Sequence, residues 1–418
     1  MTQQQPHPSP ASPSVTAARE PSIAYLVLMG LVVSTIALAT DLMLPAMGII
    51  GEAFALADMN DTAFMVSYFF AGFAVGQLFV GPLSDSYGRK PVIIIGYIVF
   101  ILGCVMSGLA PTWDILLAGR VLQGLGAAAP RVVAVAVVRD EFSGRMMARV
   151  MSFIMTVFIL IPALAPALGQ GLLYVGGWRW AFMGLIIVAI PTLIWFIFSI
   201  PETLPMARRL PLKWGDIGRS VVTICRMRVT VGYTLAMGLM FGLFVGYLST
   251  AQLVFQVGFG VGEWFAVYFG LAALSIGGAS LVNARLVMAL GMRRLTFWST
   301  ALVCLFSTGL LAWMLVVGMA AVTLTIFMCW LMLVFFFIGI TFGNLASLAM
   351  EPLGDMAGLG SGFVGSVSTL ISLPLGAVVA AHFDGTVLSL VLGFAGLSFI
   401  ALLVELWTNR GTASAPAS

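Results

Sequence analysis

Charged side chains are scarce in this sequence. Only 8% of its 418 residues are Asp, Glu, Lys or Arg, whereas a soluble domain has about 25%. Hydrophobic residues make up 61% of the chain. So little charge cannot cover a folded core with a hydrated surface. We therefore expect an integral membrane protein, and neither a soluble domain nor a nucleic-acid-binding one.

Cysteine and histidine are also rare, with four and two residues respectively. Cys104, Cys225, Cys304 and Cys329 show no paired spacing, so we expect neither a structural disulfide nor a metal site. The sequence also lacks paired catalytic carboxylates, a nucleophilic triad and a nucleotide loop in a suitable context. We expect no enzyme activity and no bound cofactor.

Long apolar runs are abundant. Runs of roughly 20 residues are long enough to cross a hydrocarbon core of about 30 Å as helices. We predict twelve spans, at residues 22–47, 62–83, 91–110, 114–138, 150–173, 180–200, 230–255, 264–284, 295–317, 320–346, 360–381 and 386–408. The fold class is an all-α integral membrane protein.

Basic residues orient these spans. With the N-terminus inside, 16 of the 19 Lys and Arg residues fall in cytoplasmic segments and only Arg179 falls outside. The other two, Arg120 and Arg131, lie within the fourth span. Positive residues favour the cytoplasmic side, so both termini are expected in the cytoplasm of an inner membrane.

The chain divides into two halves. The longest internal loop is basic, contains three prolines and leaves six spans on each side. A six-plus-six arrangement is typical of transporters built from two related bundles. The expected segments are a disordered tail (1–20), a first six-helix bundle (21–200), a linker (201–229), a second six-helix bundle (230–408) and a second tail (409–418).

Several short motifs resemble one known family. "GPLSDSYGRKP" (81–91) resembles the signature loop between the second and third helices of the major facilitator superfamily. "RVLQGLGAAA" (120–129) and "PALAPALGQG" (162–171) resemble motifs of its drug-exporting members. With "DLMLPAM" (41–47) and "PETL" (201–204), they are similar to the Bcr/CflA branch of drug:proton antiporters.

The resemblance implies two pseudo-symmetric six-helix bundles and a conformational latch. In that family the signature loop joins the two halves when the transporter faces outward. We assign the latch to Gly81, Asp85, Gly88, Arg89 and Lys90. The two glycines are expected to permit a tight turn over residues 84–90. Asp85 is expected to meet the positive N-terminal end of the helix that starts near residues 358–362.

Asp41 is the only acid deep within a predicted span. An intramembrane charge costs roughly 2.5–3.5 kcal/mol on insertion scales and is functional by default, although a structural role at a helix break near Pro45 is the alternative. Arg120 matches Asp41 in depth, so we expect the two to interact, with a purely structural ion pair as the alternative. Gln123 lies one turn from Arg120 and is expected either to orient it or to contact the substrate. Arg131 shares the face of Arg120 and either lines the cavity or reaches the interface.

Other candidates are less specific. Tyr68 and Tyr247 are candidates for an aromatic cavity wall, and helix packing is the alternative. Pro162, Pro166 and Gly169 predict a kink or a close-packed outer gate in the fifth span, and simple helix packing is the equal alternative. His382 and Asp384 are expected to be surface residues, and Glu405 is expected at the interface.

Only Asp41 among the intramembrane charges can carry a proton, because arginine stays charged. We therefore expect a proton-coupled exporter of lipophilic small molecules that acts as a monomer in the lipid bilayer. The alternative is a transporter, either an exporter or an importer, dedicated to one metabolite or siderophore. Two intramembrane arginines against one acid favour neutral, zwitterionic or anionic cargo, which supports the alternative.

Overall fold

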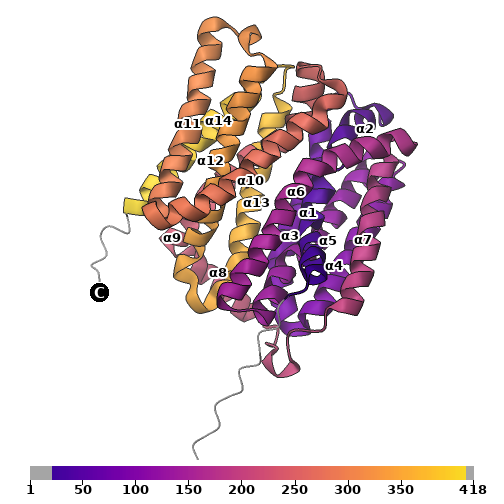
Figure 1. Cartoon of the computed structure of the whole chain (residues 1–418), viewed down its shortest axis with the longest axis vertical. Coiled ribbons are helices and arrows are strands. Elements are labelled where there is room, and N and C mark those ends of the chain that lie inside the picture. Colours follow the sequence, from indigo (N-terminus) through magenta and orange to yellow (C-terminus); the bar gives the residue numbers. More distant parts are fainter. Residues whose placement is uncertain (1–20, 411–418) are drawn as a thin grey trace, which may run out of the picture.

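A computed structural model describes residues 21–410, which form helices joined by short turns, with no strand in this range (Figure 1). The α-helices of the first half are α1 (Ile23–Asp41), α2 (Met47–Ala53), α3 (Phe64–Tyr87), α4 (Arg89–Gly108), α5 (Trp113–Glu141), α6 (Gly144–Gly176) and α7 (Arg179–Ser199). Those that follow are α8 (Trp214–Cys225), α9 (Arg228–Gln252), α10 (Phe265–Leu290), α11 (Met292–Val317), α12 (Leu324–Met350), α13 (Ala357–Ala381) and α14 (Leu388–Arg410).

Short 3-10 and π segments extend or join these helices. The 3-10 segments are η1 (Leu44–Ala46), η2 (Met59–Ala63), η3 (Met206–Arg208), η5 (Gly262–Trp264), η6 (Met319–Ala321) and η7 (Glu351–Met356), and η4 (Leu253–Gly258) is a π-helix. Twelve helical segments in the described range are long and apolar enough to cross a membrane. The twelve predicted spans are confirmed, most of them to within a few residues at each end.

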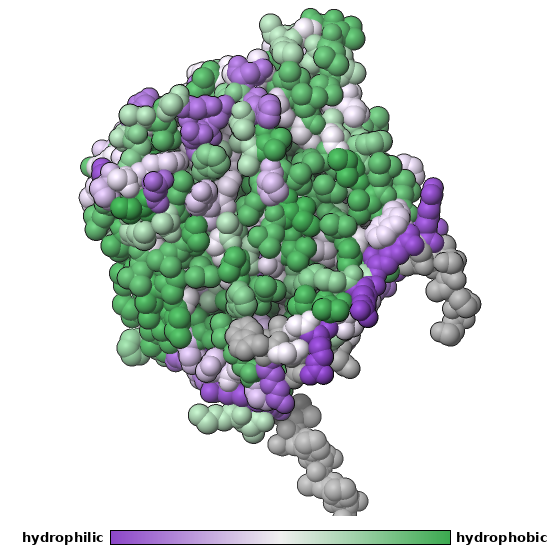
Figure 2. Space-filling view, turned by 180° about the vertical axis from the view of Figure 1, so that it is seen from behind, coloured by the Kyte–Doolittle hydropathy of each residue, from purple (hydrophilic) through white to green (hydrophobic). Residues whose placement is uncertain are grey.

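The spans form two six-helix bundles joined by a linker that contains η3 and α8. Figure 1 shows the first bundle in indigo to rose and the second in salmon to yellow. The linker, the start of α1 and the end of α14 lie at one end of the spans, called here the linker end. Figure 2 shows hydrophobic residues across the middle of one face and hydrophilic residues toward its two ends, as expected of a membrane-spanning bundle.

Two helix pairs hold the halves together: α3 with α13, and α6 with α10. The first pair is in contact along its length. Ser366 Oγ donates to the Ala74 carbonyl at 2.7 Å, and Asn60 Nδ2 near the end opposite the linker donates to the Phe383 carbonyl at 3.1 Å. In the second pair, Tyr174 Oη donates to Glu263 Oε1 at 2.7 Å at that same opposite end.

The fifth span is one helix, α6, which runs unbroken through Pro162 and Pro166. At Gly169 it packs closely on the backbone that follows α1. A Cβ atom on Gly169 would collide with the carbonyl oxygen of Leu42. Glycine therefore lets α6 lie directly against the backbone that follows Asp41, which matches the close-packed interpretation of this segment.

We predict that Gly169→Ala destabilises the fold. Alanine normally favours a helix over glycine by roughly 0.5–1 kcal/mol, but the collision with Leu42 forces α6 away and costs about 1–3 kcal/mol. The melting temperature in detergent is expected to fall. Gly171→Ala is the matched control, because a Cβ there has nothing within 4 Å. Equal melting temperatures for the two variants would contradict the packing argument.

Candidate functional site

Asp41 stands where the first span breaks. Helix α1 ends at Asp41, and the 3-10 turn η1 follows with Pro45 in it. A proline ring clashes with the carbonyl four residues earlier, which here belongs to Asp41, so the sequence ends the helix at this residue. The side chain is 2% exposed, and Thr40 Oγ1 donates to its Oδ1 at 2.9 Å.

Arg120 is fully buried on α5, at 0% exposure. Its Nε donates to the Met65 carbonyl at 3.0 Å, and its Nη1 donates to the Ala39 carbonyl at 3.1 Å and to Gln123 Oε1 at 2.5 Å. The guanidinium also lies 4.7 Å from the ring centre of Phe69. Nη2 is buried without a hydrogen-bond partner among the described residues. Gln123 therefore orients Arg120, as its position one turn away suggested.

The expected interaction of Asp41 with Arg120 is not made as an ion pair. No contact within 4.0 Å joins the two charged groups in the part of the chain that the structure describes. Arg120 instead binds the backbone carbonyl of Ala39, two residues before Asp41. A buried cation needs acceptors, and the carbonyls of neighbouring helices supply them here.

Tyr247 approaches Asp41 from the other half of the molecule. It is buried on α9, and its phenol lies close enough to the Asp41 carboxyl to interact with it electrostatically. Its hydroxyl has no hydrogen-bond partner in the described range. Its ring packs edge-on against Phe335, with the ring centres 4.8 Å apart. Tyr247 therefore joins Asp41 to the aromatic side chains between the halves.

These side chains form what we call the aromatic cluster, which contains Phe70, Phe241, Phe244, Tyr247, Phe335 and Phe342. Phe70 of α3 and Phe241 of α9 make its contact between the halves, with ring centres 5.5 Å apart. Phe69, which lies under Arg120, touches Phe70 at 5.5 Å. Aromatic contacts thus run from Arg120 across the interface to Tyr247.

The two remaining cavity candidates lie apart from this cluster. Tyr68 is 42% exposed, and its ring packs against Phe64, which is exposed as well. The guanidinium of Arg131 lies 5.1 Å from the ring centre of Phe158 on α6. The aromatic wall predicted for Tyr68 is formed instead by Phe69 and Phe70, the next residues along α3.

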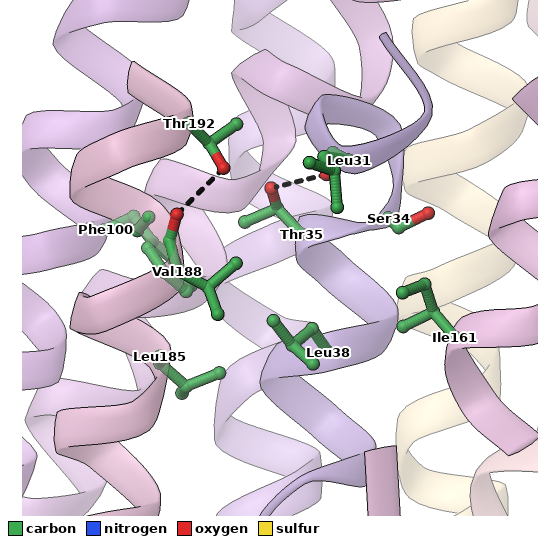
Figure 3. Close-up of a pocket in the computed structure, with 10 residues that line it drawn as sticks. Leu31, Ser34, Thr35, Leu38, Phe100, Ile161, Leu185, Val188 and Thr192 are labelled. Atoms are coloured by element: carbon green, nitrogen blue, oxygen red, sulfur yellow. Dashed lines mark hydrogen bonds between the residues drawn. The ribbon is translucent and has the colours of Figure 1, made fainter. Parts of the chain in front are cut away.

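A small void lies inside the first bundle, between α1, α4, α6 and α7 (Figure 3). Its volume of about 20 Å³ holds roughly one water molecule. The hydroxyls of Thr35 and Thr192 near it donate to carbonyls of their own helices, Leu31 and Val188. This void is too small for a substrate.

The signature motif forms an ion-pair network at the linker end. Arg89 Nη1 lies 2.6 Å from Asp85 Oδ1, and Arg89 Nε lies 3.1 Å from Asp140 Oδ2 at the end of α5. Arg89 Nη1 also donates to Ser84 Oγ at 2.7 Å. One buried arginine therefore joins α3, α4 and α5.

The turn in this motif is shorter than expected. Helix α3 continues to Tyr87 and α4 starts at Arg89, so Gly88 alone reverses the chain, with φ at 105°. Gly81 lies inside α3, with the carbonyl of Gly358 on α13 nearby. The prediction that Gly81 belongs to the turn is wrong, because a positive φ at Gly88 reverses the chain within one residue.

Glu202 explains why such a short turn is stable. Its Oε1 accepts from the Arg89 amide at 2.9 Å, and its Oε2 accepts from the Lys90 amide at 3.1 Å. A carboxylate at a helix N-terminus satisfies free amides and the helix dipole. Lys90 Nζ donates to the Ile197 carbonyl at 2.6 Å. Glu202 belongs to the "PETL" motif, but the sequence alone did not show that its carboxylate binds the amides at the start of α4.

Asp85 faces the first turn of α13, as expected. A methyl group placed on Gly358 would lie 3.8 Å from Asp85 Oδ2.

The second half has a related ion pair at its own short turn. Arg293 at the start of α11 lies 3.1 Å from Glu351 just after α12, the position that corresponds to Asp140 in the first half.

Two acids near the ends of the last spans have contrasting environments. Asp384 lies in the loop before α14, and two hydrogen bonds from Thr386 hold the pKa of its carboxyl below its usual range. Glu405 was expected at the interface, but it is 1% exposed, and Thr300 Oγ1 on α11 donates to its Oε1 at 2.7 Å. The packing of α14 against α11 buries it.

We predict that Glu202→Gln destabilises the protein. The neutral amide loses one of the two acceptor oxygens and the charge that caps α4, at a cost of about 1–2 kcal/mol. A lower melting temperature in detergent is the expected readout. Glu52→Gln is the control, because Glu52 is exposed at the end of α2. If both variants melt like the wild type, Glu202 does not stabilise the turn.

Comparison with known proteins identifies the family of this chain. The model of the Major Facilitator Superfamily matches residues 29–377. A bicyclomycin resistance protein homolog of Haemophilus influenzae is 28% identical over 74% of this chain and 77% of its own. The multidrug resistance protein MdtL of Escherichia coli is 32% identical over 54% of this chain and 56% of its own.

The fold is also found in solved structures. The crystal structure of a D-xylose-proton symporter superposes with a TM-score of 0.70 at 13% identity, over 92% of this chain and 97% of that one. Together with the twelve spans in two bundles, the family match shows that the chain is a transporter rather than an enzyme: it belongs to the Major Facilitator Superfamily.

Proposed function

We propose that this protein exports lipophilic small molecules in exchange for protons, by alternating access across the inner membrane. The observation that carries the proposal is the pairing of Asp41, a buried acid at a helix break, with the aromatic cluster across the interface. Aromatic walls suit apolar substrates of varied shape. The resistance proteins named above support the drug class.

Asp41 is the proton carrier in this proposal. Thr40 supplies a hydrogen bond from a hydroxyl, and no cation pairs with the carboxyl among the described residues. An unpaired charge at this depth is costly, so an empty site favours protonated Asp41. When α1 and α5 shift, Arg120 stabilises the carboxylate, because its Nη1 already reaches Ala39, two residues away.

The proton gradient supplies enough energy without a bound cofactor. At 100 mV and half a pH unit, one proton moving inward supplies about 3 kcal/mol, which sustains roughly a 150-fold gradient of a neutral substrate. In this scheme the linker end and both termini lie in the cytoplasm, and the contact of Asp85 with α13 stabilises the outward-facing state. The transporter works as a monomer.

We predict that Asp41→Asn abolishes proton-driven transport. The amide cannot exchange a proton, so accumulation in proteoliposomes under an imposed pH gradient should fall at least tenfold, while substrate exchange without a gradient persists. Asp114→Asn is the control, because Asp114 is exposed in the first turn of α5. Full coupling in Asp41→Asn would overturn the assignment.

A transporter dedicated to one anionic or zwitterionic metabolite or siderophore is the second candidate. The unpaired Nη2 of buried Arg120 favours it, because a substrate carboxylate would complete this group.

Resistance profiling separates the two candidates. For a drug exporter, we expect an expressing strain to resist several unrelated lipophilic drugs, and a protonophore to remove that resistance. Growth on one solute without drug resistance would favour the dedicated transporter. A strain that carries Asp41→Asn is the matched control for protein expression.

A further inference from the structure

A polar stripe runs along the linker-end part of α6. Arg145, Arg149, Ser152 and Thr156 are spaced by four, three and four residues, which places them within about 60° of one face of a helix. All four are exposed, although they lie in a candidate membrane span. Polar side chains at such positions usually face a cavity or a protein interior rather than lipid.

The stripe borders a cavity of about 500 Å³. Its lining comes from the start of α1 and from α6: Pro21, Ile23, Leu26, Arg149, Val150, Ser152, Phe153 and Thr156. This volume lies in the range that holds a drug-sized molecule. Most of the wall is apolar, and its one charged group is the guanidinium of Arg149.

The same face of α6 contacts the other half farther along the helix. Ile159 packs where a Cβ on Gly277 of α10 would lie, and the carbonyl of Ala163 lies 3.0 Å from the equivalent position on Gly270. Figure 1 shows the two helices diverging toward the linker end. The stripe therefore continues the interface between the halves into the region where α6 no longer packs on α10.

The one charged side chain that lines this cavity is positive. No hydrogen bond or ion pair joins Arg149 to another described residue. Arg145 on the same stripe is also basic, and Arg131 on the adjacent α5 stacks on Phe158. The acid Glu141 at the end of α5 interacts electrostatically with Tyr25 on α1. The hydroxyl of Thr156 donates to the Ser152 carbonyl at 2.9 Å and leaves its lone pairs free toward the cavity.

We propose that this cavity is a vestibule that first binds the transported substrate, and that Arg149 selects its chemistry. The substrate class is an amphipathic molecule with an apolar body and a carboxylate or similar acceptor, which lies against Phe153 and Leu26 while Arg149 binds the acceptor with two parallel hydrogen bonds. The proposal rests on the proposed drug export and specifies its substrate.

The test compares pyrenebutyric acid with its methyl ester, which has the same pyrene body but a methyl group in place of the negative charge. Binding to the full-length protein in phosphatidylcholine nanodiscs is measured by fluorescence, so the readout does not depend on transport or on Asp41. We expect Arg149→Gln to weaken binding of the acid about tenfold and to change binding of the ester less than twofold. Arg149→Lys should lie between the wild type and Arg149→Gln.

Arg294→Gln is the matched control, because Arg294 is exposed at the start of α11 in the other half. Equal loss of both probes in Arg149→Gln, or no loss of either, would overturn the proposal. An Arg149 effect that disappears when residues 1–20 are deleted would also overturn the proposal, because the occupant would then be the tail. An effect that appears only with anionic phosphatidylglycerol would overturn it as well, because the occupant would then be a lipid. Failure of transport with intact binding would count against the export mechanism alone.

Discussion

The buried guanidinium of Arg120 is the constraint on which the centre of this transporter depends. A permanent charge without access to water must find acceptors, and it finds the carbonyls of Met65 and Ala39 together with Gln123. Those contacts join α5 to α3 and to the last turn of α1. Any movement of α1 at Asp41 therefore changes the solvation of Arg120, so the acid and the base are coupled without touching.

The aromatic cluster complements this polar centre. Phe70 and Phe241 meet across the interface, and the chain of ring contacts ends at Tyr247, which lies within electrostatic range of Asp41. Edge-to-face contacts of this kind are each worth only about 0.5–1.5 kcal/mol. Rings can therefore separate one pair at a time as a substrate enters, whereas a network of buried hydrogen bonds would resist separation.

The sequence predicted the twelve spans, because hydropathy is a local property of the chain. It raised a helix break near Pro45 only as the alternative role for Asp41, and the structure shows α1 ending at that residue. It could not predict that Arg120 binds backbone carbonyls, since every residue carries one. It also missed the cap that Glu202 places on α4 and the burial of Glu405, because both depend on which helices become neighbours.

The attachment of the linker to the first half has a mechanical consequence. Glu202 binds α4, and the amide of Leu210 donates to the Asp85 carbonyl at 3.0 Å, so the linker up to Leu210 is fastened to the first bundle. Helix α8 begins at Trp214 and packs on α9 and α13 of the second bundle. The free tether is then only Pro211 to Lys213. The four Cα–Cα steps from Leu210 to Trp214 span at most about 14 Å. This length sets an upper limit on how far the halves can separate at this point as the transporter changes state.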